Sequence, residues 1–308
     1  MGALFAGFYL DALGRPTARA LAVGVVSQAS GQDPAASPYV RALDTALSHG
    51  LRTTRYPTVA AAEDAVERQE KYAVVVVRAD GSVLLETSSA SGSSVARVLG
   101  QASAAAQEST ATRLTTRDLH PLPPSDPSGL SAFYVTIAAT IIGFVGTFQL
   151  RVHAKPLPLP AWFTASGALA AFGSLLIVVS GVVALGLPLP FGETWWALGL
   201  QSMTASAFAA TMAVLIGRWA LLPTWLLFIL LGNTSSGGAV SPALLPEPFA
   251  SLNRWLPSGA TVSALRAAAY FPQTERWQPR LVLLAWAVAT VVALFVVCRV
   301  RRTSPGAD

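Results

Sequence analysis

The chain has 308 residues, of which 53% are hydrophobic and only 12% are charged, whereas about 25% of the residues of a typical soluble protein are charged. Residues 1–130 carry 11 Lys and Arg against 12 Asp and Glu, and residues 131–308 carry 10 against 4, so the net charge of +5 belongs to the second part. This composition excludes a uniformly basic nucleic-acid-binding protein and a single soluble enzyme, and it indicates a membrane protein.

A short apolar run opens the chain at residues 1–13. It lacks the positively charged start and the small-residue cleavage site of a signal peptide, and it is too short to cross a bilayer. We therefore expect residues 1–15 to be the remaining end of a truncated first membrane helix. A short interfacial anchor is the alternative.

Residues 16–128 alternate between strand and helix patterns, which predicts a small α/β domain. The clearest strand pattern is at 72–78, with four consecutive Val, and Asp80-Gly81 after it predicts a hairpin turn. Further strands are expected at 21–26, 51–56, 82–86 and 110–118, and helices at 39–48, 59–70 and 95–107. The proline-rich stretch 120–129 is expected to be an extended tether.

A membrane domain is expected over residues 129–302. A membrane helix needs about 20 mostly apolar residues, and the stretches that provide them are 130–150, 161–187, 195–217 and 281–298. A fifth stretch, 219–232, is shorter but uncharged, and Arg218 alone separates it from the preceding one, which predicts a tight helical hairpin. The expected fold is an α-helical polytopic membrane protein with about five spans, a small extracytoplasmic α/β domain and a tail at 303–308.

Basic residues predict the orientation of these spans. Lys and Arg accumulate in cytoplasmic loops, and here basic residues follow the first span, the third span and the last span: Arg151, His153, Lys155, Arg218, Arg299, Arg301 and Arg302. These positions share one side of the membrane if the C-terminus is cytoplasmic. Five spans then place residues 16–128 outside the cell.

Small residues indicate where the spans pack, because lipid supplies no hydrophobic drive between helices. Ser202, Ser206 and Ala210 recur every four residues on one face of the third span, which makes it the expected packing centre. The alternative is that small residues are simply frequent throughout this Ala-rich sequence.

Residues 233–279 form an external segment that is too apolar for a free loop. We expect a tight turn at 233–238 and two short amphipathic helices at 249–255 and 262–270, separated by a break at 257–259. Arg266 would face water or a lipid headgroup, and the segment would lie in the membrane interface or dip back towards the helix bundle.

Chemical motifs of common enzymes are missing from the sequence: it contains no P-loop, no H-E-x-x-H and no G-x-S-x-G. The single cysteine, Cys298, excludes an internal disulfide. His49, His120 and His153 are expected to be solvated, and the acidic residues Glu63, Asp64, Glu67 and Glu70 to form a solvated helix face rather than a cation site. We therefore expect no enzyme, no cofactor and no metal site.

Charged side chains are absent from the predicted spans, which leaves Gln149, Gln201, Ser and Thr as the polar groups there. Ion-coupled transporters place titratable or charged residues inside the membrane. The sequence therefore disfavours a proton antiporter, and it leaves open passive conduction, export powered elsewhere or no transport.

Three short motifs before the last span carry a resemblance to a known family. They are Gly232-Asn233-Thr234-Ser235-Ser236-Gly237, Pro242-Ala243-Leu244-Leu245-Pro246, and Leu256-Pro257-Ser258-Gly259-Ala260 followed by Leu265, Arg266 and Tyr270. With the stretch 121–134, they resemble the C-terminal part of type-2 ABC exporter permeases and the related phage-infection-protein (YhgE/Pip) family, in its actinobacterial form. The chain departs from the family at Thr234, where proline is usual, and in its short first span.

The resemblance implies a bacterial plasma-membrane permease-like subunit. Such subunits act as homodimers or with a related permease subunit, and a separate cytoplasmic ATP-binding subunit drives export. The resemblance makes the loop 151–160, with Arg151 and Lys155, the candidate ATPase contact, and plain positive-inside anchoring is the alternative. It also selects a candidate re-entrant or interfacial motif made of Asn233, Gly237, Pro246, Pro257, Gly259, Arg266 and Tyr270.

A second function stays open beside the exporter. The chain is then a membrane-anchored surface, scaffold or receptor protein whose outer domain binds a partner, without transport activity. The bilayer is the partner expected under both hypotheses, and nucleic acid is expected under neither.

Overall fold

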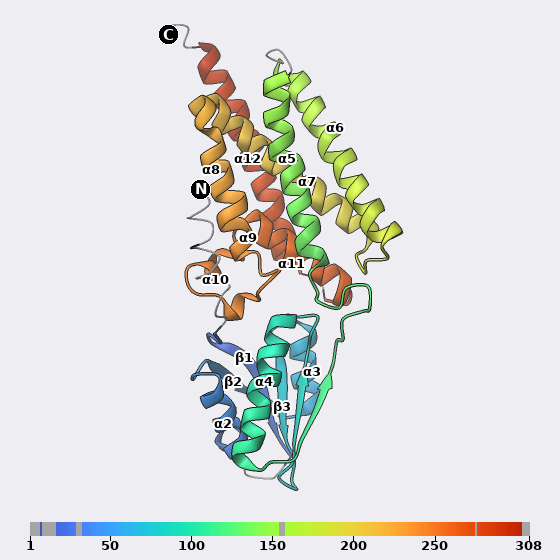
Figure 1. Cartoon of the computed structure of the whole chain (residues 1–308), viewed down its shortest axis with the longest axis vertical. Coiled ribbons are helices and arrows are strands. Elements are labelled where there is room, and N and C mark those ends of the chain that lie inside the picture. The colour runs from blue at the N-terminus through green and yellow to red at the C-terminus, as the bar shows by residue number, and fades with distance from the viewer. Residues whose placement is uncertain (1–6, 8–16, 29–32, 154–157, 275, 304–308) are drawn as a thin grey trace. The chain divides into compact units, whose positions relative to one another are not determined.

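A computed structural model (Figure 1) describes residues 7, 17–28, 33–153, 158–274 and 276–303. The predicted helix stump at 1–15, apart from Gly7, and residues 304–308 of the predicted tail lie outside the described residues. The chain divides into two compact units, an α/β unit formed by 1–129, 239–250 and 270–274, and a helical unit formed by 130–238, 251–269 and 275–308.

The α/β unit is built on a five-stranded sheet with the order β2-β1-β3-β4-β5. Strand β1 pairs in parallel with both β2 and β3, β3 pairs antiparallel with β4, and β4 pairs in parallel with β5. The strands are β1 (Leu21–Ser27), β2 (Leu51–Arg55), β3 (Ala73–Val77), β4 (Val83–Thr87) and β5 (Leu114–Asp118). Gly81, at φ +78°, makes the expected hairpin turn between β3 and β4.

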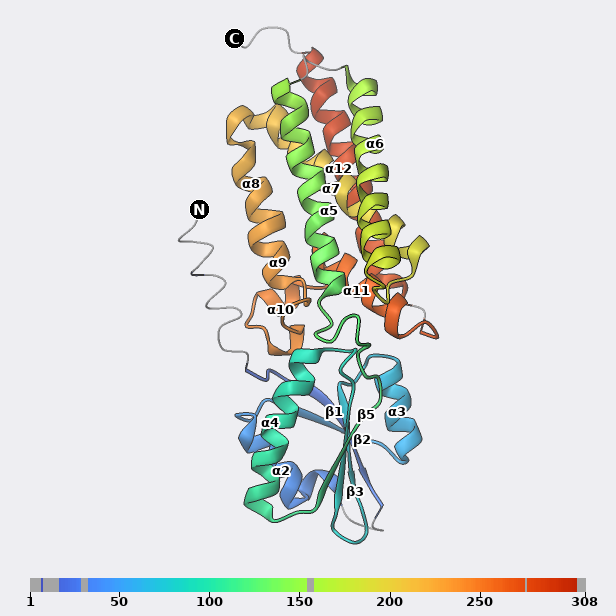
Figure 2. The ribbon, with the colours of Figure 1, turned by 45° about the vertical axis from the view of Figure 1, so that its right-hand side comes forward.

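Helices cover both faces of this sheet, as Figure 2 shows. Helices α2 (Pro38–Ala46) and α4 (Ser93–Thr110) pack on one face around Leu43, Val75 and Leu99, and α3 (Val59–Glu67) packs on the other. Strand β3 is buried along its whole length, which is why four consecutive Val occur there. The predicted last strand began too early, because Thr110 ends α4 and donates its hydroxyl to the Ala106 carbonyl.

Two segments of the predicted external segment 233–279 belong to the α/β unit. Leu244, in a single 3₁₀ turn (Pro242–Leu244), is fully buried in the core of α2, α4 and the sheet, and the Ser241 backbone N–H donates to the Ser94 hydroxyl over 2.9 Å. The prediction of an interfacial segment was wrong for this part, because these apolar residues complete a protein core and do not face lipid.

The proline-rich stretch 120–129 is also packed, so the prediction of an extended tether was wrong. Asp126 is buried and accepts a hydrogen bond from the Tyr270 hydroxyl over 3.0 Å, and the Ser93 hydroxyl donates to the Ser128 carbonyl over 2.8 Å. Two successive turns, closed by the backbone N–H groups of Asp126 and Gly129, replace the extended conformation.

The helical unit is centred on α7 (Phe191–Ile216), which packs against α5 (Ser131–His153), α6 (Leu159–Val178) and α12 (Trp277–Thr303). A π-helical turn (Val179–Ala184) extends α6. After α7, the chain passes through a 3₁₀ turn (Gly217–Ala220), α8 (Leu221–Trp225), a π-helical turn (Leu226–Leu231) and α9 (Gly232–Ser235), and then α10 (Phe249–Leu252) and α11 (Pro257–Tyr270).

Four helices among the described residues are long and apolar enough to cross a membrane: Ser131–His153, Leu159–Ala184, Phe191–Ser235 and Trp277–Arg301. The third is a run of 45 residues that reverses direction at Gly217, which has φ +60°. Its second arm, Leu221–Ser235, is only roughly 22 Å long at 1.5 Å per residue, whereas a bilayer core is about 30 Å thick. By length, therefore, the structure gives four clear candidates where five were predicted.

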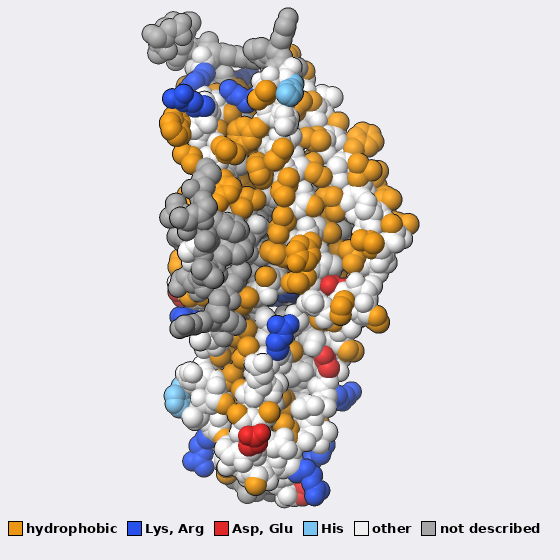
Figure 3. Space-filling view, in the orientation of Figure 1, with side chains coloured by type: hydrophobic (Ala, Val, Ile, Leu, Met, Phe, Trp, Pro, Cys, Tyr) orange, Lys and Arg blue, Asp and Glu red, His pale blue; other side chains and the backbone are white. Residues whose placement is uncertain are grey.

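The surface of the helical unit is strongly apolar. Hydrophobic side chains spread over it in Figure 3, and several large ones project from α6 and the π-helical turn after it, including Phe172, Leu176 and Val183 at 67–68% exposure. Soluble proteins rarely expose contiguous apolar patches of this kind. This surface suits contact with lipid.

Candidate functional site: a polar cluster inside the helical unit

Four uncharged polar side chains meet inside the helical unit, and we call them the polar cluster: Thr140 of α5, Gln201 of α7, and Ser258 and Thr261 of α11. All four are buried, and Gln201 is 0% exposed. The Gln201 amide nitrogen donates to the Thr140 hydroxyl over 2.8 Å and to the Ser258 hydroxyl over 3.3 Å. The Thr261 hydroxyl donates to the Gln201 amide oxygen over 3.1 Å.

Helix α11 brings Ser258 and Thr261 into the cluster because of how it begins. Proline is favoured in the first turn of a helix, where its missing N–H costs nothing, and Pro257 occupies that position. A side chain on Gly259 would collide with the Asn253 carbonyl oxygen, and one on Gly232 would come within 2.8 Å of the Ser258 hydroxyl. Glycine at both positions therefore permits this close packing.

Two predictions about this segment were wrong. Residues 257–259 were expected to break a helix, yet they form its first turn, and residues 233–235 were expected in a tight turn, yet Asn233 lies within α9. Helix α11 was expected either in the membrane interface or dipping back towards the bundle, and it is buried in the bundle along most of its length. Apolar and small residues such as Val262, Leu265 and Ala260 pack against α5, α6, α7 and α12.

Arg266 was expected to face water or a lipid headgroup, and the structure places it partly buried against the protein. Its guanidinium donates to the Gly237 carbonyl oxygen over 3.1 Å. The Asn253 side chain likewise donates to the Ser235 carbonyl over 2.8 Å. The Arg266 contact joins the first and third resemblance motifs, and the two contacts together satisfy carbonyl groups at and just after the end of α9.

The residues of the candidate re-entrant motif do not form one site. Asn233, Gly237, Pro257, Gly259 and Arg266 lie in the helical unit. Pro246 and Tyr270 belong to the α/β unit, where the Tyr270 hydroxyl is bound to Asp126. The motif is therefore divided between two packing environments.

The expected packing residues of the third span lie against neighbouring helices. Ser202, Ser206 and Ala210 are all buried. A side chain on Gly143 of α5 would collide with the Ser202 carbonyl oxygen, and Ser206 and Thr147 share a hydrogen bond of 2.6 Å between their hydroxyls. The backbones of α5 and α7 therefore approach closely, as small residues at a helix contact permit.

Basic residues gather at one end of the helical unit, where α5 and α12 end and α7 turns into α8. Arg151 is exposed in the last turn of α5, and Arg301 donates to the Leu215 carbonyl over 2.8 Å. Lys155, the second residue of the candidate ATPase contact, lies outside the described residues.

His120 was expected to be solvated, and the structure contradicts this. Its Nε2 contacts the Glu67 carboxylate, its Nδ1 lies 3.3 Å from the Ser88 hydroxyl, and its ring packs on Phe271 at 4.9 Å between centroids. The acidic face of α3 was expected to be solvated, but two of its carboxylates contact other side chains. Glu67 contacts His120, and Glu63 lies 3.5 Å from Arg117.

Serine, histidine and glutamate therefore meet in the α/β unit, a set that can serve nucleophilic catalysis when substrate reaches the hydroxyl. Ser88 is only 2% exposed and shares a hydrogen bond of 2.8 Å with Ser91. Its burial leaves no space for a substrate at the hydroxyl. The contacts therefore hold His120 against the end of α3 and against Ser88, the residue directly after β4. No local sequence signal joins positions 67, 88 and 120.

A buried carboxylate in the α/β unit, Glu86, lies 3.2 Å from Arg117. Burial raises the pKa of Glu86, and the neighbouring Glu63 carboxylate raises it further, while Arg117 opposes both. Within the described part of the chain, no three His, Cys, Asp or Glu side chains are grouped closely enough to hold a metal ion.

Comparison of the chain with protein-family models, with curated proteins and with solved structures gives no match.

Proposed function

We propose that this chain is an integral plasma-membrane, permease-like subunit of a bacterial exporter that is powered by a separate cytoplasmic ATPase. The observation that carries the proposal is the polar cluster. Burying hydrogen-bonding groups inside an apolar bundle costs free energy unless they are paired. Paired polar side chains inside membrane bundles occur at helix contacts and along substrate pathways, and the proposal assigns the second role to this cluster.

The chemistry of the polar cluster favours an external energy source. Amide and hydroxyl groups do not change charge at physiological pH, so Gln201, Thr140, Ser258 and Thr261 cannot couple transport to a proton by titration. Coupling ions in membrane transporters usually have charged or titratable partners. ATP hydrolysis by another subunit, acting at the basic end that includes Arg151, is consistent with this chemistry.

The proposed topology has five passes, with Leu221–Ser235 as a short fourth pass, the C-terminus in the cytoplasm and residues 16–128 outside. Two observations support it, the reversal at Gly217 and the basic residues at one end of the helical unit. A short pass can be accommodated by thinning of the bilayer. Four passes would instead place residues 16–128 and the C-terminus on the same side.

Cysteine accessibility tests the topology in a Cys298→Ser background. A membrane-impermeant maleimide should label Arg97→Cys in intact cells, and it should label Arg218→Cys and Arg301→Cys only after permeabilisation. Labelling of residues 97 and 301 from the same side would contradict five passes.

Affinity purification tests the function. Tagged full-length protein from native membranes should bring down a nucleotide-binding ATPase in stoichiometric amount. The double variant Arg151→Ala with Lys155→Ala should lose this partner, whereas Arg254→Ala, which removes an exposed arginine elsewhere in the helical unit, should keep it. Purification without an ATPase would contradict the exporter, and survival of the complex in the double variant would contradict the loop as its contact.

A membrane-anchored surface or receptor protein is the second candidate. It is favoured by the α/β unit, which has a hydrophobic core on each face of its sheet, as a folded binding domain does. Secretion or surface components in place of the ATPase, in the same purification, would support this second function.

A further inference from the structure

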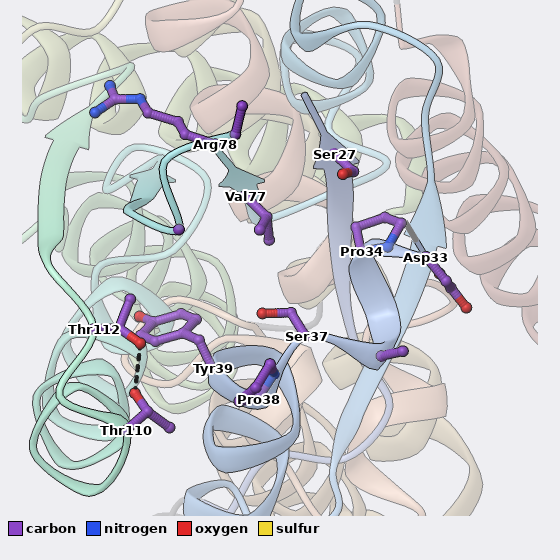
Figure 4. A pocket seen from close by; sticks show the side chains of 13 residues that line it. Ser27, Asp33, Pro34, Ser37, Pro38, Tyr39, Val77, Arg78, Thr110 and Thr112 are labelled. Carbon is purple, nitrogen blue, oxygen red and sulfur yellow. Dashed lines mark hydrogen bonds between the residues drawn. The ribbon is translucent and has the colours of Figure 1, made fainter. Parts of the chain in front are cut away.

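A cavity of about 450 Å³, lined by Ser37 and Tyr39 among others, opens in the α/β unit at the carboxyl ends of β1 and β3 (Figure 4). It lies where the connections through α2 and α3 diverge to opposite faces of the sheet. The Tyr39 hydroxyl is bonded with Ser103 and lies towards Thr112, and the Asp33 carboxylate accepts a backbone N–H of the following turn over 3.1 Å. Both side chains therefore have partners within the unit, and neither selects a ligand.

The helical unit has a groove of about 440 Å³ between α5 and α6, which run side by side in Figures 1 and 2, and we call it the α5–α6 groove. One stripe of α5 lines it, with Gly146, Gln149, Leu150 and His153 at helical spacing, together with Leu169 of α6. A side chain on residue 146 would collide with the Leu169 side chain, so the two helices touch there. The groove runs from this contact to the end of α5.

The wall of the α5–α6 groove is mostly apolar. Gly146, Leu150 and Leu169 are half-buried in it, on the surface of a helix that is long and apolar enough to cross a membrane. The volume lies within the range of ligand sites, which is about 300–1,000 Å³. In a bilayer the apolar surface of a span faces hydrocarbon, so an acyl chain is the occupant that this wall fits.

Gln149 adds a polar group to the apolar wall. Its side chain is exposed and makes no hydrogen bond within the described part of the chain. A polar group without a partner is costly in hydrocarbon. Gln149 follows the start of α5 at Ser131 by about 27 Å, at 1.5 Å per residue, which is close to the edge of a bilayer core about 30 Å thick. At that depth its amide can donate to the ester or phosphate oxygens of a lipid.

Charge selects the headgroup of this lipid. Arg151 and His153 lie exposed in the last turn of α5, at the end of the helical unit where basic residues gather. In the described part of the helical unit the one acidic side chain is Glu193, and it pairs with Arg280 over 3.1 Å at the start of α7. Basic pockets between membrane helices bind anionic headgroups. The mouth of the groove therefore favours a negatively charged lipid.

We propose that the α5–α6 groove binds one anionic phospholipid. An acyl chain lies in the groove against Leu150 and Leu169, and the Gln149 amide and the His153 ring N–H donate to the phosphate at its mouth. The proposal rests on the helical unit lying in a bilayer, which the proposed function also requires, and it does not depend on transport.

Native mass spectrometry of the full-length protein in detergent tests the proposal by lipid titration. Phosphatidylglycerol should bind about five-fold more tightly than phosphatidylcholine with the same acyl chains, the effect of roughly one basic residue near an anionic headgroup. Glycerol 3-phosphate, which has the phosphate but no acyl chain, should not displace the lipid at about 1 mM. Equal affinity for the two lipids, or displacement by glycerol 3-phosphate, would overturn the proposal.

Variants locate the lipid in the groove. Gln149→Leu should weaken phosphatidylglycerol binding about five-fold, the loss of one net hydrogen bond, whereas Gln278→Leu makes the same change at the start of α12 and should leave the affinity unchanged. Leu150→Trp fills the groove and should abolish saturable binding, whereas Leu176→Trp, on the exposed surface of α6 outside the groove, should not. Unchanged affinity in Gln149→Leu or in Leu150→Trp would contradict the site.

Melting temperatures measured without added lipid show whether each variant is folded. Gln149 is exposed, so its variant tests the site even if Leu150→Trp lowers the melting temperature. Gln149→Leu also keeps Arg151 and Lys155, so it should not change the co-purification of an ATPase. Selective lipid binding without an ATPase would contradict the exporter alone, and an ATPase without selective lipid binding would overturn the lipid site alone.

Discussion

The close approach of α5 and α7 makes a sharp prediction about two glycines. Gly143 of α5 faces the backbone of α7, where an added side chain would collide with the Ser202 carbonyl oxygen and come within 3.0 Å of the Ala205 Cβ atom. Gly167 of α6 has no heavy atom within 4 Å of the same position. Substitution by alanine should therefore have opposite effects at the two sites.

The expected change in the free energy of unfolding combines a gain from the higher helix propensity of alanine with a cost from steric crowding between the helices. Replacing Gly by Ala within a helix favours folding by about 0.8–1.0 kcal/mol, and this is the whole effect expected for Gly167→Ala. At Gly143, overpacking adds a cost of about 1–3 kcal/mol. Separation of the helices also weakens the hydrogen bond between Thr147 and Ser206, since interhelical bonds in membrane proteins contribute about 0.6 kcal/mol on average. Gly143→Ala should therefore destabilise the helical unit by about 1–2 kcal/mol.

Reversible unfolding in mixed detergent–SDS micelles measures this difference by tryptophan fluorescence. All eight Trp belong to the helical unit, so the signal reports that unit alone. The two variants should differ by about 2–3 kcal/mol. Equal stability of Gly143→Ala and Gly167→Ala would refute the close contact of α5 with α7 and the role of Ser202 at that contact.

Three further predictions concern buried polar groups. Gln201→Leu should lower the free energy of unfolding by about 1–2 kcal/mol in the same assay. The loss stays small because the Thr140 and Thr261 hydroxyls keep their hydrogen bonds to carbonyls of their own helices. A loss above about 4 kcal/mol would show that Gln201 satisfies more than these hydroxyls. Arg266→Met should cost about 1.5–3 kcal/mol through its bond to Gly237, and no loss would contradict that contact. Folding raises the pKa of Glu86, so the stability that this carboxyl contributes is present below its unfolded pKa and declines as the pH rises above about 4.5. Glu86→Gln should remove this part of the pH dependence of the melting temperature. An unchanged pH profile in the variant would contradict the raised pKa.

Much of the fold could be predicted from local patterns, because hydrophobic periodicity and turn residues act over short distances. The β3 strand at 73–77 and the Asp80-Gly81 turn are confirmed, and so is the presence of long apolar helices, although four meet the length criterion where five were expected. The failures occur where tertiary contacts decide. Pro257-Ser258-Gly259 has the composition of a helix break, but the same residues start α11 once a proline takes the first turn.

The external segment was misread for a related reason. Its apolar residues were correctly identified as too numerous for a free loop, and the bilayer interface or a return towards the helix bundle were the explanations considered. The structure supplies another one, because Leu244 fills the core of the α/β unit and Leu265 fills that of the helical unit. Apolar composition predicts that a segment is buried, and it does not distinguish lipid from protein as the surroundings.

The polar cluster of the helical unit and the cavity of the α/β unit could not be predicted from the sequence, for the same physical reason. Gln201 could be recognised as a polar group within an apolar stretch, but Ser258 and Thr261 become its partners only when α11 packs beside α7. The cavity at Ser37 and Tyr39 depends on the strand order, because β1 must lie between β2 and β3 before their connections diverge. Strand order is a property of long-range pairing, and the strand patterns of this sequence are compatible with several orders. Once the order is known, the crevice at the carboxyl ends of β1 and β3 follows from the topology.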